Sequence, residues 1–87
     1  MPVEDYSKIV TLGEGGTSLL ECPRLAADIG VRMLYVKTDG LGNPTGSLKD
    51  RSVAVAATKA LEFGYRVMAC DSSGNKAASV AAYAARA

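Results

Sequence analysis

The stretch Asn43-Pro44-Thr45-Gly46-Ser47-Leu48-Lys49-Asp50-Arg51 places a lysine at the start of a predicted helix, directly behind a turn that contains proline and glycine. The helix macrodipole disfavours a cation in the first turn by about 0.3–1 kcal/mol, so Asp or Glu is more usual there. Lys49 is therefore a candidate for an amine that takes part in chemistry. An ordinary exposed lysine is the alternative interpretation, and a second element that converges on Lys49 would favour the chemical one.

The helix that follows this stretch is the best supported element of the chain. Ser47 and Asp50 have the spacing of a capping box, in which each side chain binds the backbone N–H of the other residue. Gly64 stands where a glycine commonly ends a helix. Apolar residues recur between these limits with the helical period, and the predicted buried face holds Val53, Ala56, Ala57, Ala60 and Leu61.

Three short segments have the composition of β-strands: residues 9–12, 33–37 and 66–70. Between the first two, a helix is expected over residues 23–29, with proline in its first position and Gly30 as its stop. Strands and helices therefore alternate along the chain.

An alanine-rich helix is expected from about Lys76 onward. Its predicted buried face consists of small residues, which let two backbones approach closely: Ala77, Val80, Ala81 and Ala84. No glycine or cap follows it, so we expect the chain to be one partial domain, residues 1–87, cut from a longer protein.

The order β-α-β-α-β-α predicts an α/β fold with a short parallel sheet and right-handed crossovers. In such a unit the loops that follow the strands meet at the carboxyl edge of the sheet, where ligands bind. The loop with Lys49 follows residues 33–37, and residues 71–75 follow residues 66–70. Both loops are therefore expected on one rim.

The second loop, Ser72-Ser73-Gly74-Asn75, leads into the last helix. Its backbone N–H groups and hydroxyls would suit a carboxylate or a phosphate, and Asn75 could present its amide to a ligand oxygen. An ordinary helix cap is the alternative interpretation. The amine of Lys49 would be useful beside this loop if it were kept neutral by burial or captured by an aldehyde.

Composition limits the remaining classes of function. The chain has 87 residues, a formal net charge of +1 and no histidine. A nucleic-acid partner and a metal site are therefore not expected, and acid–base chemistry must use lysine, a carboxylate, tyrosine or a cofactor. No apolar run approaches a membrane span, so we expect a soluble, cytoplasmic chain, with Cys22 and Cys70 reduced in its core.

Four blocks of this sequence resemble the N-terminal part of the threonine synthase family. They are Leu12-Gly13-Glu14-Gly15-Gly16-Thr17-Ser18-Leu19-Leu20, Leu34-Tyr35-Val36-Lys37, the stretch from Asn43 to Arg51, and the stretch from Ser72 to Ser79. These enzymes depend on pyridoxal phosphate and have fold type II, the fold of the tryptophan synthase β subunit. The blocks span most of the chain in the family's order, so the resemblance is specific to this fold family.

The resemblance implies a role for each candidate residue. Lys49 would form the Schiff base with the cofactor aldehyde and later move protons, and Asn75 would hydrogen-bond the 3′-oxygen of the pyridine ring. Ser72, Ser73 and Gly74 would receive the substrate carboxylate. The family reaction converts O-phosphohomoserine and water to threonine and phosphate.

The sequence departs from the family pattern at four positions. Ser18 stands where proline is usual, Leu48 where phenylalanine is usual, and Lys76 where threonine is usual. Asp71 adds a negative charge just before the loop that would bind a carboxylate, which leaves the substrate preference open.

The family's phosphate-binding loop and the hydroxyl that meets the pyridine nitrogen lie beyond residue 87, so whether this chain is itself an enzyme stays open and we expect it to be inactive alone. One alternative is a stand-alone, non-catalytic remnant that binds a small anion or a protein partner. Another is self-association through the alanine face of residues 77–85.

Overall fold

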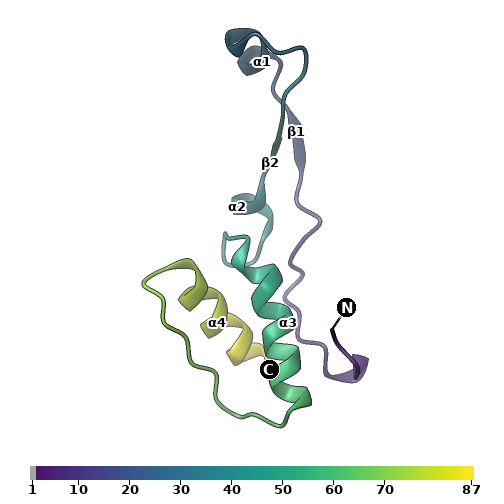
Figure 1. Ribbon diagram of the computed structural model, residues 1–87, viewed down its shortest axis with the longest axis vertical. Coiled ribbons are helices and arrows are strands. Elements are labelled where there is room, and N and C mark those ends of the chain that lie inside the picture. Colours follow the sequence, from purple (N-terminus) through teal and green to yellow (C-terminus); the bar gives the residue numbers. More distant parts are fainter. Residues whose placement is uncertain (1) are drawn as a thin grey trace.

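The computed structural model describes residues 2–87 and combines helices with one pair of strands. In chain order the elements are the 3₁₀ turn η1 (Tyr6–Lys8), β1 (Leu19–Glu21), α1 (Pro23–Ile29), β2 (Tyr35–Lys37), α2 (Asp39–Gly42), α3 (Lys49–Glu62) and α4 (Asn75–Arg86). Figure 1 shows an arm, formed by β1, β2 and α1, that extends from a body formed by α3 and α4. The molecule measures 52 × 29 × 16 Å along its principal axes.

Helices α1 and α3 end where their glycines predict. At the end of α3, the Gly64 N–H donates to the carbonyl oxygen of Leu61 and the Tyr65 N–H to that of Ala60. Gly64 has φ +75°, a left-handed conformation that glycine adopts at low cost. This pair of bonds is a Schellman motif, and Gly30 ends α1 in the same way.

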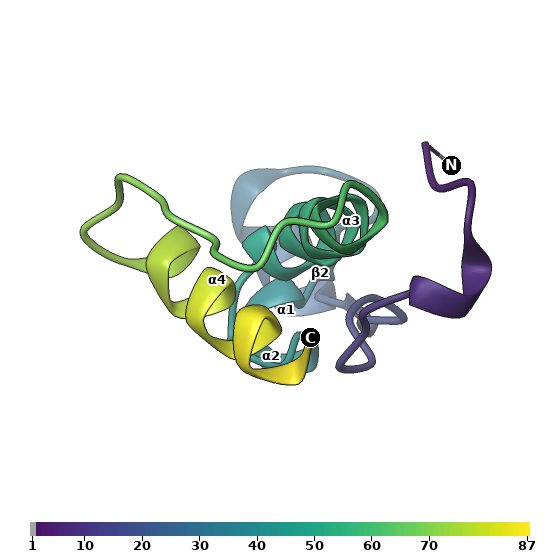
Figure 2. The same ribbon diagram turned by 90° about the horizontal axis from the view of Figure 1, so that it is seen from below.

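Helices α3 and α4 run in the same direction and pack side by side (Figures 1 and 2). The core between them consists of Val10, Val53, Ala54, Ala57 and Tyr83. The predicted buried faces are therefore only partly confirmed. Ala56 on α3 is exposed. Ala81 and Ala84 are exposed because α4 presents the side that carries Ser79 and Tyr83 to α3.

The predicted parallel sheet is not confirmed. Within residues 2–87 the structure has one sheet, an antiparallel pair in which Leu19 lies opposite Lys37, Leu20 opposite Val36 and Glu21 opposite Tyr35. All six residues are exposed. A parallel sheet needs further strands beside it and cover on both faces. Within residues 2–87, neither further strands nor covering helices lie against this hairpin.

Two of the predicted strands are not formed within residues 2–87, because their backbones have other partners or none. The Val10 N–H donates to the Thr58 hydroxyl on α3, 3.0 Å away, so residues 9–12 lie along this helix and not in a sheet. Residues 66–70 connect α3 to α4 without strand or helix pairing, and Val67 is 83% exposed. The segment 33–37 is confirmed over Tyr35–Lys37.

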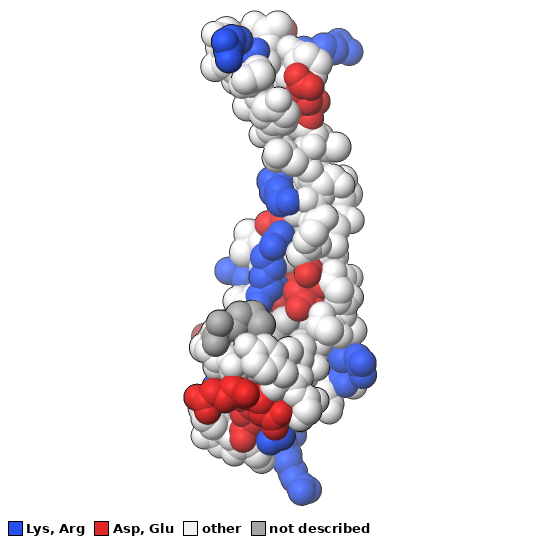
Figure 3. All heavy atoms as spheres, turned by 90° about the vertical axis from the view of Figure 1, so that its right-hand side faces the viewer, with Lys and Arg blue, Asp and Glu red and all other residues white. Residues whose placement is uncertain are grey.

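The surface carries its charges in a mixed pattern. On the face seen in Figure 3, basic and acidic side chains alternate along the length of the molecule. Cys22 and Cys70 are free thiols, as expected, but both are half-buried and outside the core. No helix of residues 2–87 is long and apolar enough to cross a membrane.

Candidate functional site

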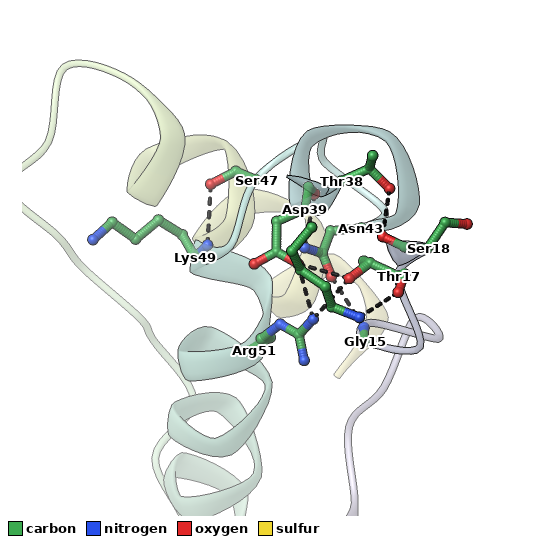
Figure 4. A network of polar contacts seen from close by, with 10 residues as sticks. Gly15, Thr17, Ser18, Thr38, Asp39, Asn43, Ser47, Lys49 and Arg51 are labelled. Atoms are coloured by element: carbon green, nitrogen blue, oxygen red, sulfur yellow. Dashed lines mark hydrogen bonds and ion pairs between the residues drawn. The ribbon is translucent and has the colours of Figure 1, made fainter. Parts of the chain in front are cut away.

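Lys49 is the first residue of α3, as predicted. Its backbone N–H donates to the Ser47 hydroxyl oxygen, 3.0 Å away, which fixes the first turn of the helix. Its side chain is exposed and points away from the polar cluster around Arg51 and Asp39 (Figure 4). Within residues 2–87 no carboxylate lies within ion-pair distance of Lys49 Nζ. The amine is therefore accessible to a ligand.

The second predicted loop leads directly into α4. Asn75 is the first residue of this helix, and the Gly74 N–H donates to the Ser72 hydroxyl oxygen, 3.3 Å away. Ser73, Gly74 and Asn75 are exposed, and Ser72 is half-buried. The polar groups of this loop are thus open to solvent at the N-terminal end of α4.

The two loops lie at the same end of the body. Because α3 and α4 run in the same direction, the helix starts that carry Lys49 and Asn75 face the same way (Figure 1). The common rim that the sequence predicts therefore arises from parallel helices, while the parallel strands that were to produce it are absent from residues 2–87.

Asp50 joins the two helices directly behind this rim. The Thr45 N–H donates to Asp50 Oδ2 at 2.7 Å, and the Thr45 hydroxyl donates to Oδ1 at 2.5 Å. The Ser79 hydroxyl, from α4, also donates to Oδ1. Burial acts to raise the pKa of Asp50, but the hydrogen bonds from Ser79 and Thr45 outweigh it and hold the pKa below its ordinary value.

The hydrogen-bond partner that the sequence predicts for the Asp50 carboxylate is wrong. A capping box requires the carboxylate to bind the Ser47 N–H, whereas it binds the Thr45 N–H and hydroxyl and reaches Ser79. The spacing of Ser79 was an available signal, because a residue four positions after Asn75 lies on the same face of the helix.

The glycine-rich turn at residues 13–16 is held against the loop before α3. The Gly15 N–H donates to Asn43 Oδ1 at 3.0 Å. The Thr17 hydroxyl donates to Asp39 Oδ1 at 2.8 Å, and Arg51 Nη2 lies 2.9 Å from the same oxygen (Figure 4). The hydrogen bond from Thr17, followed by the one from Arg51, lowers the pKa of Asp39.

A second contact joins this turn to α4. The Tyr83 hydroxyl, on a side chain with 0% exposure, donates to Glu14 Oε2 at 2.6 Å. Burial acts to raise the pKa of Glu14, but hydrogen bonds led by that of Tyr83 lower it overall. Burial, together with the Glu14 carboxylate, raises the pKa of Tyr83. The turn, the Lys49 loop and α4 therefore form one connected polar assembly.

Comparison with known proteins gives a consistent family. A family model described as pyridoxal-phosphate dependent enzyme matches residues 10–87. The chain is 54% identical over 86 residues to a protein named threonine synthase from Methanocaldococcus jannaschii, covering 99% of this chain and 21% of that protein. It is 53% identical to the threonine synthase of Methanosarcina acetivorans and 52% identical to that of Mycobacterium leprae, covering all of this chain and 21% and 24% of those proteins.

The chain thus spans about a fifth to a quarter of the length of these relatives. Pyridoxal phosphate is the cofactor that the family implies. The side chains at the rim suit it, because the exposed amine of Lys49 can react with an aldehyde and the exposed amide of Asn75 can bind a ring oxygen. The match over residues 10–87 establishes that this chain belongs to the pyridoxal-phosphate-dependent enzyme family.

Proposed function

We propose that this chain carries the cofactor-lysine half of a threonine synthase site, in an enzyme that converts O-phosphohomoserine and water to threonine and phosphate. The observation that supports this most is the shared direction of α3 and α4. Because of this shared direction, the Lys49 amine and the loop of residues 72–75, with the amide of Asn75, lie at one end of the body. A site for this cofactor and a substrate carboxylate would use both.

We assign the individual roles as follows. Lys49 would hold the cofactor covalently through Nζ, and Asn75 would donate its amide N–H to the ring oxygen. The loop Ser72-Ser73-Gly74 would receive the substrate carboxylate through hydroxyl and backbone N–H donors, at a helix start where the macrodipole favours an anion. Asp71 would oppose such an anion by its charge, and the positive charge of the exposed Lys76 would offset this.

The chemistry at the reacting carbons divides between the cofactor and the protein. When bound, pyridoxal phosphate supplies an aldehyde that reacts with amines and a ring that accepts electrons. Lys49 Nζ would take protons from the substrate carbons and return them, because it is the basic group of the rim. Asn75 would orient the ring, and Ser72 and Ser73 would orient the substrate.

The rest of the cofactor site would come from other parts of the polypeptide. In this proposal, the phosphate-binding loop and the group facing the pyridine nitrogen belong to the length of the relatives that this chain does not span. The chain by itself is then expected to bind pyridoxal phosphate without turning over substrate.

We also propose that residues 66–70 become a strand of a parallel sheet in the longer enzyme. The side chain of Met68 packs against the core while Val67 is 83% exposed, which is the alternation of a strand with one open face. The backbone of this segment would then pair with strands from the remaining sequence.

The test is an absorption scan of the chain with added pyridoxal phosphate, beside the Lys49→Ala variant. Borohydride reduction and peptide mapping then identify the labelled lysine. We expect a visible band that depends on Lys49 and a reduced adduct on that residue. Equal labelling of Lys8, Lys37 and Lys59, with the same band in the variant, would instead refute the proposed role of Lys49.

A protein partner is the second candidate, and a specific observation favours it. Leu19, Leu20, Tyr35 and Val36 of the hairpin are each 41–61% exposed. Such apolar exposure is typical of surfaces that another chain or segment covers. For the isolated chain, this candidate function can be tested as self-association through the hairpin.

A further inference from the structure

Asp50 is a wholly buried carboxylate. Its exposure is 0%, and within residues 2–87 it forms no ion pair with Lys or Arg. The adjacent arginine, Arg51, pairs with Asp39 instead. Burying an ionised carboxylate costs free energy unless hydrogen bonds replace the lost water. The groups that replace this water therefore indicate the role of the Asp50 carboxylate.

Three donors surround Asp50: the Thr45 N–H, the Thr45 hydroxyl and the Ser79 hydroxyl. Each hydroxyl has a single proton to donate, and both protons are directed to Asp50 Oδ1. The distance of 3.0 Å between Thr45 Oγ1 and Ser79 Oγ thus results from sharing one acceptor. The carboxylate brings together two hydroxyls from segments that are far apart in sequence.

The joined segments are those that carry the proposed site. Thr45 belongs to the loop before α3, and Asp50 directly follows Lys49. Ser79 is buried on α4, one helical turn and about 6 Å along the axis from Asn75. A shift of α4 relative to the start of α3 would therefore stretch or break the hydrogen bonds of Asp50.

We propose that Asp50 is a positioning residue that fixes the start of α4 to the loop in front of Lys49, and so keeps Lys49 and Asn75 at a constant separation. The inference rests on the proposed function, because it assigns Asp50 to the same site. Asp50 acts only through Thr45 and Ser79. A mobile α4 would leave the amine intact but would let the amide and the serine loop drift away from it.

Two variants remove the contact in different ways. Asp50→Asn keeps the shape but exchanges one acceptor oxygen for an NH₂ group, so in either orientation of the amide some donors lose their acceptor. Ser79→Ala deletes one hydroxyl, whereas Ser79→Thr retains it as the conservative variant. Asp28→Asn is the matched control, because Asp28 is an exposed carboxylate on α1.

The first readout is amide hydrogen exchange in the 87-residue chain, without cofactor. We expect the amides of residues 78–80 to exchange about tenfold faster in Asp50→Asn and Ser79→Ala, as for the loss of one hydrogen bond to a charged group. In Ser79→Thr and Asp28→Asn these amides should exchange at the wild-type rate. In every variant the amides of the last turn of α3 should also exchange at the wild-type rate. If Asp50→Asn does not fold, the comparison of Ser79→Ala with Ser79→Thr decides.

The second readout is the selectivity of pyridoxal phosphate and borohydride for Lys49 over Lys8 and Lys59. We expect this selectivity to be lost in Asp50→Asn and Ser79→Ala and kept in Ser79→Thr. Unchanged exchange at residues 78–80 would overturn the inference, as would equal acceleration throughout α3 and α4. If the exchange pattern is as expected but the wild type shows no selectivity for Lys49, the proposed function is refuted, whereas the positioning role of Asp50 is supported.

Discussion

At the scale of single residues, Gly42 shows how closely α2 packs on Thr17, the residue that follows the glycine-rich turn. A Cβ atom at Gly42 would lie 2.7 Å from Thr17 Cγ2 and 3.2 Å from Thr17 Cα. Thr17 cannot move aside freely, because its hydroxyl is bound to Asp39 and Arg51. We expect Gly42→Ala to lower the free energy of unfolding by about 1–3 kcal/mol, the usual cost of overpacking, measured by urea denaturation.

The matched control for this prediction is Gly40→Ala in the same helical turn. A Cβ atom at Gly40 would meet the carbonyl oxygen of Gly46 at 3.6 Å, an ordinary contact. We expect this variant to stay within about 0.5 kcal/mol of the wild type. Equal urea midpoints for the two variants would contradict the close packing of Gly42 on Thr17.

A second residue, Glu62, makes the stability depend on pH. The hydrogen bond from Lys59 is the largest cause that lowers the pKa of Glu62 from 4.5 to about 2, and the backbone N–H groups of Asp5 and Glu4 add to it. Since the pKa is lower in the folded state, Glu62 stabilises the fold above pH 4.5 and loses this contribution as the pH falls toward 2.

The prediction is tested with Glu62→Gln, which cannot ionise. We expect the wild type to exceed this variant in free energy of unfolding by the largest amount near neutral pH, with the difference shrinking below pH 4.5. Urea denaturation over a series of pH values gives this difference directly. A difference that does not change between neutral pH and about pH 3 would show that the pKa of Glu62 is not lowered by folding.

At the scale of elements, Tyr83 attaches α4 to the glycine-rich turn through Glu14. Tyr83→Phe removes this donor, so we expect the pKa of Glu14 to rise and the free energy of unfolding to fall by about 1.5–3 kcal/mol, the range for a hydrogen bond to a charged group. The measurements are an NMR titration of Glu14 and urea denaturation. Tyr65→Phe, at a side chain that is 64% exposed, is the control; an unchanged pKa of Glu14 in Tyr83→Phe would contradict the prediction.

The helices could be predicted from the sequence more accurately than the strands, and the reason is physical. The limits of α1 and α3 depend on local features, namely a proline at the first position and glycines with positive φ at the stops. Residues 9–12 have strand composition too, yet the Thr58 hydroxyl binds the Val10 N–H. A strand requires a partner, and local composition does not say whether one is present.

In the candidate site, too, local features could be predicted from the sequence and contacts between distant segments could not. The positions of Lys49 and Asn75 at two helix starts follow from local signals, and both were predictable. The role of Asp50 was not, because its partner Ser79 lies 29 positions away. The spacing of Ser79 from Asn75 indicates the helix face on which Ser79 lies, but not which side chain it binds. Contacts between distant segments depend on how the helices pack.

At the scale of the whole molecule, the chain is more extended than a compact domain of its length. Its radius of gyration is 16.5 Å, against about 12 Å for a compact domain of this length. Its accessible surface is 6022 Å², whereas a compact protein of 9.0 kDa would expose about 4,900 Å². The excess exceeds the roughly 800 Å² that each partner buries in a standard interface.

We therefore expect the isolated chain to self-associate through the hairpin of β1 and β2, where apolar side chains are exposed on an arm that extends from the body. Sedimentation velocity should give an average mass that rises with concentration. Leu20→Lys combined with Val36→Glu places charges on opposite residues of the hairpin and should shift the chain to monomer. Leu41→Lys, at a side chain that is 86% exposed on α2, changes the same chemistry elsewhere and should leave association intact. If the wild type is monomeric at all concentrations, the hairpin of the 87-residue chain stays exposed to water, and association through it is excluded.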